Sequence, residues 1–482
     1  MVVSQQRTDL VEKVLEDGQF QAQLANAIEQ AKEENTTRIA CIALKWQGSL
    51  DFVDLFERNP LMVKMQVFWR DGDLPSGKSL AIGEAVSFQA QAANVFDEAR
   101  SLWRNTVAQF VGNGSKWVRF FCGQAFDPET ERDVVWKEWP AGLMFLPRYL
   151  FIEEELGIRL VISLEVTKEL DLASAVHAIR AELQRLSDPL ERVERDFQEP
   201  LTFAQSSAAD LETVESDSLQ WKKAVAHVVQ KIARKEFAKV VLARRRVWRA
   251  KEQISSATVL RNLLTRYETG VVFALQYVDQ VFVGASPERL VQSFKQHVHI
   301  DCLAGTTARD QDLESDAQAA TQLLASQKDR SEHAHVLRGI LQDVQDVVGD
   351  LSYPDAPKLR SLTNVHHLYT PIEGYRLDGT TILDLVARLH PTPAVAGLPK
   401  HAAMMEIRVQ EQMDRGFYAG PIGWLDAQGD GAFNVALRCG LLCGRDAVLY
   451  AGAGIVEDSN PWAEWAETEW KLQPMQTALS EE

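Results

Sequence analysis

Two residues in the second half of the chain could perform acid–base chemistry. Lys239 opens the run KVVL (239–242), whose dense apolar composition predicts a strand buried on both faces. An ammonium ion there either packs its stem and keeps its head in water, or loses its proton near neutrality and acts as a base. Glu288 follows another apolar strand and a Gly-Ala-Ser-Pro turn (284–287). It is either an exposed turn acid or a general acid opposite Lys239.

Two predicted helices each carry a pair of carboxylates. Asp329 and Glu332 lie at i and i+3 in the helix expected over 328–344, and Glu464 and Glu467 have the same spacing in the last helix. Each pair could be a solvated helix face. Two such pairs also suit one Mg²⁺ ion, which prefers hard oxygen ligands and keeps positions for water and substrate. We therefore expect Mg²⁺ as the cofactor.

Other cofactor classes are not indicated by the sequence. His333 and His335 lie at i and i+2, which points them to different sides of a helix and argues against zinc. No phosphate loop or dinucleotide glycine pattern follows a strand, so nucleotide cofactors are not expected. The cysteines form no Cys-x-x-Cys pair and are predicted to be buried thiols; they are Cys41, Cys122, Cys302, Cys439 and Cys443.

Several residues could bind a small anion beside such a metal. Arg438 is predicted to lie on an otherwise apolar strand, where it is either half of a buried ion pair or a cation for a ligand. Residues 451–471 are predicted to contain, in order, a strand, a glycine-rich turn and a helix starting near Pro461, and the N–H groups of the turn could hold an anion. Gly305 and Thr306 suggest a second turn, and Tyr418 offers another donor. Together these residues describe a site for a small dianion with magnesium.

Composition excludes several other functions. The chain has 482 residues, 46% of them hydrophobic and 25% charged, which is ordinary for a globular protein. A net charge of -17 argues against a nucleic-acid surface, so the ligand is expected to be small. No apolar run approaches the roughly 20 residues of a membrane span. Because the N-terminus resembles neither a secretory signal nor a transit peptide, we expect a cytoplasmic protein.

The predicted elements combine long strands with helices outside them. A helix is expected over 8–35 and another over 220–235, before the Lys239 strand. Residues 186–219 lose periodicity and gather Asp, Glu, Ser and Pro, which predicts a long surface connection between two halves. The strands expected in the first half cover 61–70, 117–126, 141–155 and 158–166.

The second half resembles the chorismate-utilising enzymes through a series of motifs. The resemblance spans about residues 220 to 475, whereas residues 1–215 match only loosely. It implies an α/β (α+β) fold in which residues 1–482 form one large domain of two packed β-sheets with helices outside. Within it, 1–215 would be a variable N-terminal half and 216–478 the chorismate-binding catalytic half. The motifs are FAKVVLARR, FVGASPERLV, LAGTTARD, SEHAHVL, VHHLYTPIEG, LHPTPAVAGLPK, FYAGPIGW and YAGAGIVEDSNPWAEWAETEWK.

Within this family the motifs are most similar to those of isochorismate synthases. The resemblance implies conversion of chorismate to isochorismate with Mg²⁺. Lys239 would activate the water that attacks ring C2, and Glu288 would protonate the departing C4 hydroxyl. The implied metal ligands are Glu332 and Glu467, with Asp329 and Glu464 nearby or acting through water. The implied substrate-binding residues are Gly305, Thr306, His367, Ala394, Tyr418, Arg438, Gly452, Ala453, Gly454 and Lys471.

Related activities on the same fold are the alternatives. Resemblance to the ammonia-adding anthranilate synthases would favour glutamine in place of Lys239, and aminodeoxychorismate synthases typically carry a lysine where Ala304 stands. Salicylate synthases, which eliminate pyruvate from isochorismate, tend to have threonine in place of Ala394. A salicylate synthase and a non-catalytic chorismate-binding module therefore remain as alternatives. The lysine makes a glutaminase partner unnecessary, and we expect a monomer.

Two positions depart from the family pattern, and the pathway is left open. Asp310 and Cys122 stand where glycine is common, and Asp310 could alter the loop beside the substrate. Neither departure removes a proposed catalytic group. Menaquinone, phylloquinone or a siderophore could each lie downstream of isochorismate.

Overall fold

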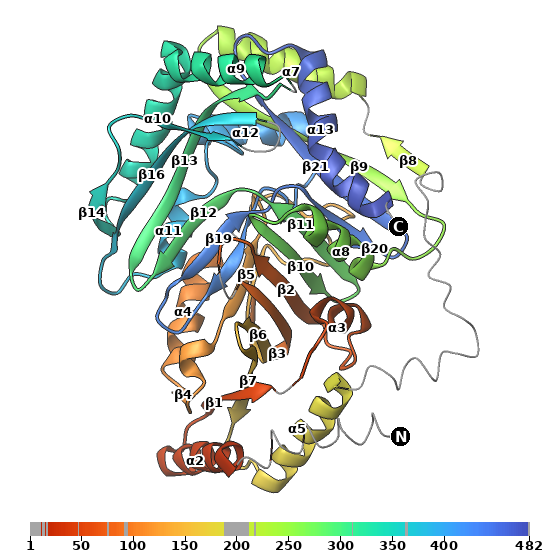
Figure 1. Ribbon diagram of the computed structural model, residues 1–482, viewed down its shortest axis with the longest axis vertical. Helices are drawn as coiled ribbons and strands as arrows, with labels where there is room; N and C mark the ends of the chain where they lie inside the picture. Colours follow the sequence, from red (N-terminus) through yellow and green to blue (C-terminus); the bar gives the residue numbers. More distant parts are fainter. Residues whose placement is uncertain are drawn as a thin grey trace.

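The computed structural model is built around one large hydrogen-bonded network of 21 strands (Figure 1). It describes residues 11, 15, 18–46, 48–74, 77–90, 95–187, 212–215, 218–310, 312–361 and 365–480. Among the described strands, β1 and β4 pair in parallel and the other pairings are antiparallel. The predicted mixed fold of sheets with outer helices is confirmed.

The network has two arms that meet at β6 (Gly142–Glu154), because β6 pairs with both β3 and β5. The expected two sheets are therefore continuous through this one strand. The first arm runs through β3 (Lys78–Ala90), β2 (Met65–Asp71), β10 (Val271–Tyr277), β11 (Gln280–Ser286), β20 (Cys439–Cys443), β21 (Asp446–Ile455) and β9 (Lys239–Arg249). The second runs through β5 (Phe120–Gln124), β18 (Pro421–Leu425), β19 (Gly431–Val435), β12 (Arg289–Phe294), β13 (His297–Ala308) and β16 (Val365–Arg376).

Further strands add to this network. They are β1 (Arg38–Trp46), β4 (Phe110–Val111), β7 (Gly157–Val166), β8 (Glu212–Glu215), β14 (Val348–Ser352), β15 (Lys358–Ser361) and β17 (Gly397–Leu398).

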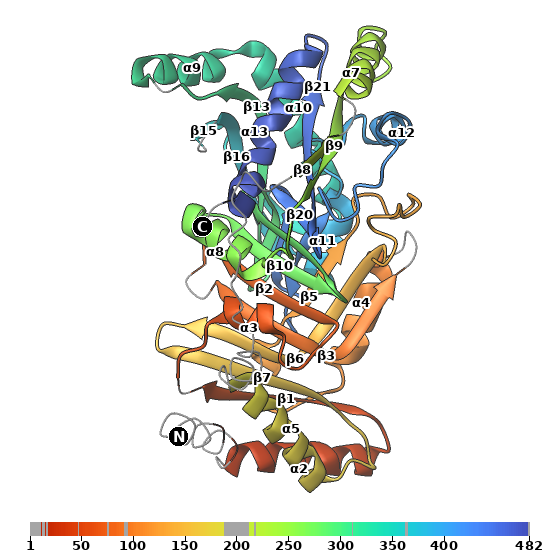
Figure 2. The ribbon, with the colours of Figure 1, turned by 90° about the vertical axis from the view of Figure 1, so that its right-hand side faces the viewer.

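Strand alternation divides the interior into two cores. On β10, Val271, Phe273 and Leu275 face a core shared by both arms, while Val272 and Ala274 face a core beneath helices. The helices α8 (Ser256–Arg266) and α13 (Pro461–Ser480) cover this second face, as the two views show (Figures 1 and 2). The remaining helices are α2 (Gly18–Glu34), α3 (Phe52–Arg58), α4 (Val95–Val107), α5 (Leu172–Ser187), α7 (Ser218–Ala233), α9 (Leu313–Ala325), α10 (Gln327–Val344), α11 (Ile382–Leu389), α12 (Lys400–Glu411) and the short η1 (Ser115–Trp117).

The two halves of the sequence are joined through strand pairing. β2 of the first half pairs with β10 of the second, and β5 pairs with β18. The predicted connection over 186–219 lies largely outside the described residues. Its described part differs from the prediction, because β8 (Glu212–Glu215) pairs with β9 as a strand. Of the helix expected over 8–35, the described part includes Gly18–Glu34, while residues 8–10 lie outside it.

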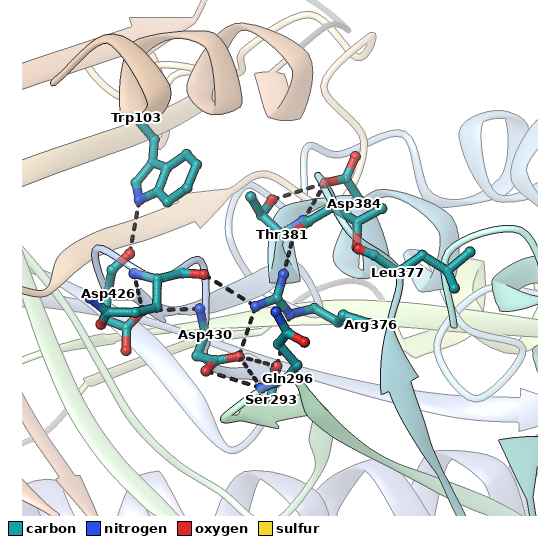
Figure 3. Close-up of polar contacts among 11 residues, drawn as sticks. Trp103, Ser293, Gln296, Arg376, Leu377, Thr381, Asp384, Asp426 and Asp430 are labelled. Atoms are coloured by element: carbon teal, nitrogen blue, oxygen red, sulfur yellow. Dashed lines mark hydrogen bonds and ion pairs between the residues drawn. The ribbon is translucent and has the colours of Figure 1, made fainter. Parts of the chain in front are cut away.

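A buried arginine ties several loops of the second arm together (Figure 3). Arg376, 5% exposed, lies 2.9 Å from Asp430 Oδ1 and donates to Ser293 Oγ at 3.0 Å. It also donates to the backbone oxygens of Thr380 and Gln428. The end of β16 is thereby locked to the β12–β13 and β18–β19 hairpins.

The cysteine prediction holds for four residues and is wrong for one. All five cysteines are free, and Cys443 is exposed because β20 ends there at a surface turn. Burial raises the pKa of the Cys302 thiol to about 12. Among the described helices, none is both long and apolar enough to cross a membrane.

Candidate active site

Lys239 begins β9 as predicted, and its side chain extends into a space between β21 and α10. Its backbone pairs with Leu398 of β17. A Cβ on Gly454 would lie 2.9 Å from Lys239 Cε, so the absence of a side chain at Gly454 leaves room for the lysine stem. The ammonium nitrogen lies 3.8 Å from Glu332 Oε1, and the Lys239 side chain is 21% exposed. The lysine head is therefore shielded from most of the solvent and faces a carboxylate.

Glu288 lies in the connection between β11 and β12, at the strand end that the sequence predicts. Its backbone N–H donates to Ser286 Oγ at 3.2 Å, and its carbonyl accepts from Val435 N at 3.1 Å. Burial raises the pKa of Glu288 to about 6, while the positive charges of Lys239, Lys471 and Arg438 act in the opposite direction. A fraction of this carboxyl is thus protonated near neutral pH.

The last helix brings Glu464 and Glu467 close together. Burial raises the pKa of Glu464, Ser459 lowers it through a hydrogen bond of 2.6 Å, and the charge of Glu467 raises it further. Glu467 Oε1 lies 2.6 Å from Lys471 Nζ, and both side chains are part exposed. Glu464 and Glu467, the predicted i, i+3 pair, therefore repel each other. A divalent cation bound beside them would reduce this repulsion.

The other carboxylate pair, on α10, faces the same region. Glu332 faces Lys239, and Asp329 exchanges hydrogen bonds with the cap residue Ser326. A Cβ on Gly305 would lie 3.2 Å from Asp329 Cβ. Within the part of the chain that the structure describes, no three His, Cys, Asp or Glu side chains form a ready-made metal site. Mg²⁺ commonly takes only one or two carboxylates and completes its shell with water and substrate, so these hard oxygen donors fit it.

The glycine-rich stretch forms the end of β21, so the predicted turn is wrong. Gly452 pairs with Ala243 and Gly454 with Val241. Since Ala243 and Val241 direct their N–H groups away from β21, toward Glu411 and Ala396, the two glycines direct theirs away from β9. β20 pairs with β21 only as far as Leu449. The N–H groups of Gly452 and Gly454 therefore lie along the edge of β21 that β20 leaves unpaired, and not in a turn.

Lys471 crosses this edge from α13. Its Nζ donates to the backbone oxygen of Gly452 at 2.9 Å. Burial lowers the pKa of Lys471, and the nearby Glu467 carboxylate opposes that change. Ala453 lies between the two glycines and pairs with Leu242. The Lys471 ammonium group and the N–H groups at the edge of β21 together give this side of the site a positive electrostatic potential.

Arg438 is not on a strand, which corrects the prediction. It lies in the connection from β19 to β20, with φ at 48°. This connection crosses from one arm to the other, and the left-handed backbone makes the turn. Burial lowers the pKa of Arg438, while Tyr418, Tyr267, Glu467 and Glu288 raise it. We find no ion pair of Arg438 with any described residue, so the buried ion-pair alternative is not supported.

Thr306 and His367 meet across β13 and β16. Thr306 Oγ1 lies 2.8 Å from His367 Nδ1, where the register shifts between Ala304 and Thr306. The expected turn at Gly305 is therefore a bulge within β13, and Gly305 has φ at 77°. Burial lowers the pKa of His367 to about 4, and the charges of Lys471 and Lys239 add to this effect. The imidazole is neutral at physiological pH.

Tyr418 and Ala394, which are also predicted to bind the substrate, lie in different surroundings. Tyr418 is buried and stacks on Tyr450, with ring centroids 5.4 Å apart. Its hydroxyl would lie 3.2 Å from a Cβ on Gly452, which places it at the same strand edge. Ala394 is exposed in the turn before β17, and no described contact joins it to the other site residues.

Asp301 is a site neighbour that sequence reasoning missed. It accepts hydrogen bonds from Arg360 Nη1 at 2.6 Å and Tyr369 OH at 3.0 Å, and its negative charge raises the pKa of Glu288. Asp301 lies in the middle of β13 and carries no local motif. An acid within the largely apolar stretch VHIDCLA (298–304) was the available signal.

The chain aligns with proteins of known name over nearly its whole length. It is 32% identical over 474 residues to the isochorismate synthase MenF of Bacillus subtilis, covering 96% of this chain and 98% of that one. It is 36% identical over 435 residues to the salicylate biosynthesis isochorismate synthase of Pseudomonas aeruginosa, covering 88% and 89%.

Solved structures share the fold. The menaquinone-specific isochorismate synthase MenF of Escherichia coli matches with a TM-score of 0.74 at 24% identity, covering 94% of this chain and 100% of that one. Anthranilate synthase component I of Streptococcus pneumoniae matches with a TM-score of 0.65 at 20% identity, covering 86% and 92%. The sequence profile described as chorismate binding enzyme matches residues 26–480. The chain belongs to the family of chorismate-binding enzymes.

Proposed function

We propose that the protein is an isochorismate synthase that converts chorismate to isochorismate with Mg²⁺. The observation that carries the proposal is the gathering of Lys239, Glu288 and two cationic side chains around one site. The near full-length similarity to named isochorismate synthases supports the same reaction. The lysine in the opening of β9 favours addition of water over addition of ammonia.

Lys239 and Glu288 divide the proton transfers. Lys239, in its neutral amine form, takes a proton from a water molecule as the water oxygen bonds to ring C2. The ring double bonds shift, the C4–O bond breaks, and Glu288 gives its proton to the departing hydroxyl. One water enters and one leaves, so the reaction is an isomerisation. The raised pKa of Glu288 supports its role as the acid, because a share of the carboxyl holds a proton to give.

Cationic and neutral donors bind the two carboxylates of the substrate. Arg438 has no described ion-pair partner and is free to meet an anion, and Lys471 adds an ammonium group at the edge of β21. The N–H groups of Gly452 and Gly454 and the hydroxyl of Tyr418 supply uncharged donors there. The neutral imidazole of His367, oriented by Thr306, lies against the ring.

Magnesium would be held by Glu332 and Glu467, with Asp329 and Glu464 nearby or acting through water. When bound, the ion would neutralise the ring carboxylate and fix its position. Lys239 and Lys471 lie against two of these carboxylates, Glu332 and Glu467. We expect the enzyme to act as a monomer without a glutaminase subunit. The pathway that uses its product is not assigned, because the names of the relatives divide among menaquinone, salicylate and vibriobactin.

Incubation of the purified protein with chorismate tests the proposal. Reactions with Mg²⁺ or with EDTA are followed by chromatography for isochorismate, salicylate, anthranilate and pyruvate. Isochorismate formed only with Mg²⁺, without pyruvate, supports the proposed function. Salicylate together with pyruvate would instead identify a salicylate synthase. Absence of product from folded, magnesium-supplied protein would favour a non-catalytic chorismate-binding module.

A further inference from the structure

The end of β2 (Met65–Asp71) lies in the first half of the sequence, yet it contacts the residue that follows Glu288. Arg289 follows Glu288 in sequence, and its guanidinium forms a two-pronged ion pair with Asp71 at the end of β2. Arg289 Nη2 donates to Asp71 Oδ1 at 2.9 Å, and Nη1 lies 2.9 Å from Oδ2 without the alignment of a hydrogen bond. Asp71 is 1% exposed and Arg289 is 8% exposed. The charge-assisted hydrogen bond and the second close contact together restrict the orientation of both side chains.

Further contacts hold this ion pair in one arrangement. Asp71 Oδ1 also accepts from the backbone N–H of Asp73 at 3.1 Å. Arg289 contacts Asp73 Oδ2 and Gln292 Oε1, each at 3.3 Å. The Asp71 backbone is paired with Val271 of β10. The carboxylate that receives Arg289 is therefore attached to the rigid interior of the first arm.

The same end of β2 supports the residues that precede Glu288. Gly72 N donates to the backbone oxygen of Gly270 at 2.8 Å, and Arg70 donates to the backbone oxygens of Tyr267 and Glu268. Gly270 has φ at 73°, and a Cβ there would lie 2.6 Å from the oxygen of Ser286. Packing against Gly270 therefore supports the chain just before Glu288, and the ion pair with Asp71 fixes the residue just after it.

We infer that Asp71 is a positioning residue that holds Glu288 in its reactive orientation through Arg289. The inference rests on the proposed function, in which Glu288 is the general acid. Adjacent residues share a peptide unit, so rotation of Arg289 would displace the Glu288 backbone. A misplacement of about 1 Å can cost about 100-fold in rate, because proton transfer needs close contact. The first half of the chain therefore contributes to catalysis through Asp71.

The test compares Asp71→Asn with Asp279→Asn. The first variant keeps the shape of the side chain and removes its charge, while Asp279 is an exposed residue in the turn between β10 and β11. We expect Asp71→Asn to lower kcat at least about 10-fold with KM changed by less than about twofold, because substrate contacts stay intact. Asp279→Asn should match the wild type. Circular dichroism and thermal unfolding check that each variant is folded.

Two readouts separate positioning from a general loss of stability. Without the Asp71 charge, Arg289 keeps only the half-exposed Asp73 carboxylate as a counter-charge. The positive charge of Arg289 then favours ionised Glu288 more strongly, so the basic limb of the kcat profile should move to lower pH. In a Glu288→Gln background, Asp71→Asn should cause no further loss of rate. An unmoved limb together with an equal loss in both backgrounds would overturn the inference.

A second variant, Arg289→Lys, tests the inference if Asp71→Asn does not fold. Arg289→Lys keeps the positive charge but lacks the two-pronged geometry. It should lower kcat with KM retained, and full kcat in this variant would overturn the inference. If the wild type forms isochorismate while both variants match it, the inference alone fails. If the wild type forms no isochorismate, the proposed function fails and the inference falls with it.

Discussion

Lys471 and Glu467 form an ion pair of 2.6 Å one turn apart on α13. Glu467, a proposed metal ligand, is thus paired with Lys471, a proposed substrate-binding cation. Binding of Mg²⁺ at Glu467 would release the ammonium group for the substrate carboxylate. Mg²⁺ and chorismate are therefore each expected to increase the affinity of the site for the other.

Glu467→Gln should raise the Mg²⁺ concentration needed for half-maximal activity or abolish turnover. The amide keeps the side-chain shape but is a neutral and weaker ligand for a hard cation. A magnesium activation curve at saturating chorismate measures the effect. Glu457→Gln is the control, because Glu457 is 57% exposed and pairs only with Lys235 in the described contacts. Unchanged magnesium dependence in Glu467→Gln would refute the ligand assignment.

Lys239→Ala should lower kcat by about 100-fold to 10,000-fold, the range that a positioned base commonly supplies. The fold should persist, since Lys239 is the first residue of β9 and its side chain is only partly buried. Steady-state isochorismate formation and circular dichroism measure both effects. Lys223→Ala, at an exposed position of α7, should behave as the wild type. Substantial activity in Lys239→Ala would remove its assigned role.

Turnover should fall as the pH rises through about 6, because Glu288 acts in its protonated form and burial raises its pKa to that value. The Asp301 charge contributes to this raised pKa, so Asp301→Asn should move the basic limb to lower pH. A profile of kcat against pH measures both. Glu288→Gln should show low activity without this limb. A basic limb that persists in Glu288→Gln would assign it to another group.

Arg376→Met should destabilise the protein by about 3–5 kcal/mol, because it leaves the buried Asp430 carboxylate without its cation. Urea unfolding measures the change in the free energy of unfolding. Arg388→Met is the matched control, since Arg388 and Asp346 are 32% and 61% exposed. An exposed pair of this kind contributes about 1 kcal/mol or less. Equal effects of the two substitutions would show that the buried cluster is not a special source of stability.

Local sequence patterns predicted the elements that carry most of the proposed site. The apolar run after Lys239 forms β9, and the spacing of Glu464 and Glu467 does place them side by side on α13. These signals are local, because a strand alternates every two residues and a helix repeats every 3.6. The fold class followed from the motif series and is confirmed.

The errors arose where pairing partners decide the conformation. Gly452 and Gly454 suggested a turn, but pairing with β9 keeps them extended, and Lys239 and Tyr418 need the space that their missing side chains leave. Gly305 suggested another turn and forms a bulge against β16. Arg438 suggested a strand because its neighbours are apolar, whereas the crossing between the arms needs a bend there.

Long-range pairs were beyond the reach of local patterns. Asp71 and Arg289 are separated by more than 200 residues and meet because the end of β2 lies near the beginning of β12. Asp301 contacts Arg360 and Tyr369 through the register of β13 and β16. Such contacts depend on strand order, which one sequence does not define.

The pairings of β2 with β10 and of β5 with β18 limit how the chain can be divided. A fragment beginning near residue 216 would keep the proposed acid and base but would uncover one edge of β10 and one edge of β18. Unpaired edges of buried, apolar strands are templates for edge-to-edge aggregation. An isolated catalytic half would therefore be expected to self-associate, whereas co-expression with the missing half would restore the complementary edges.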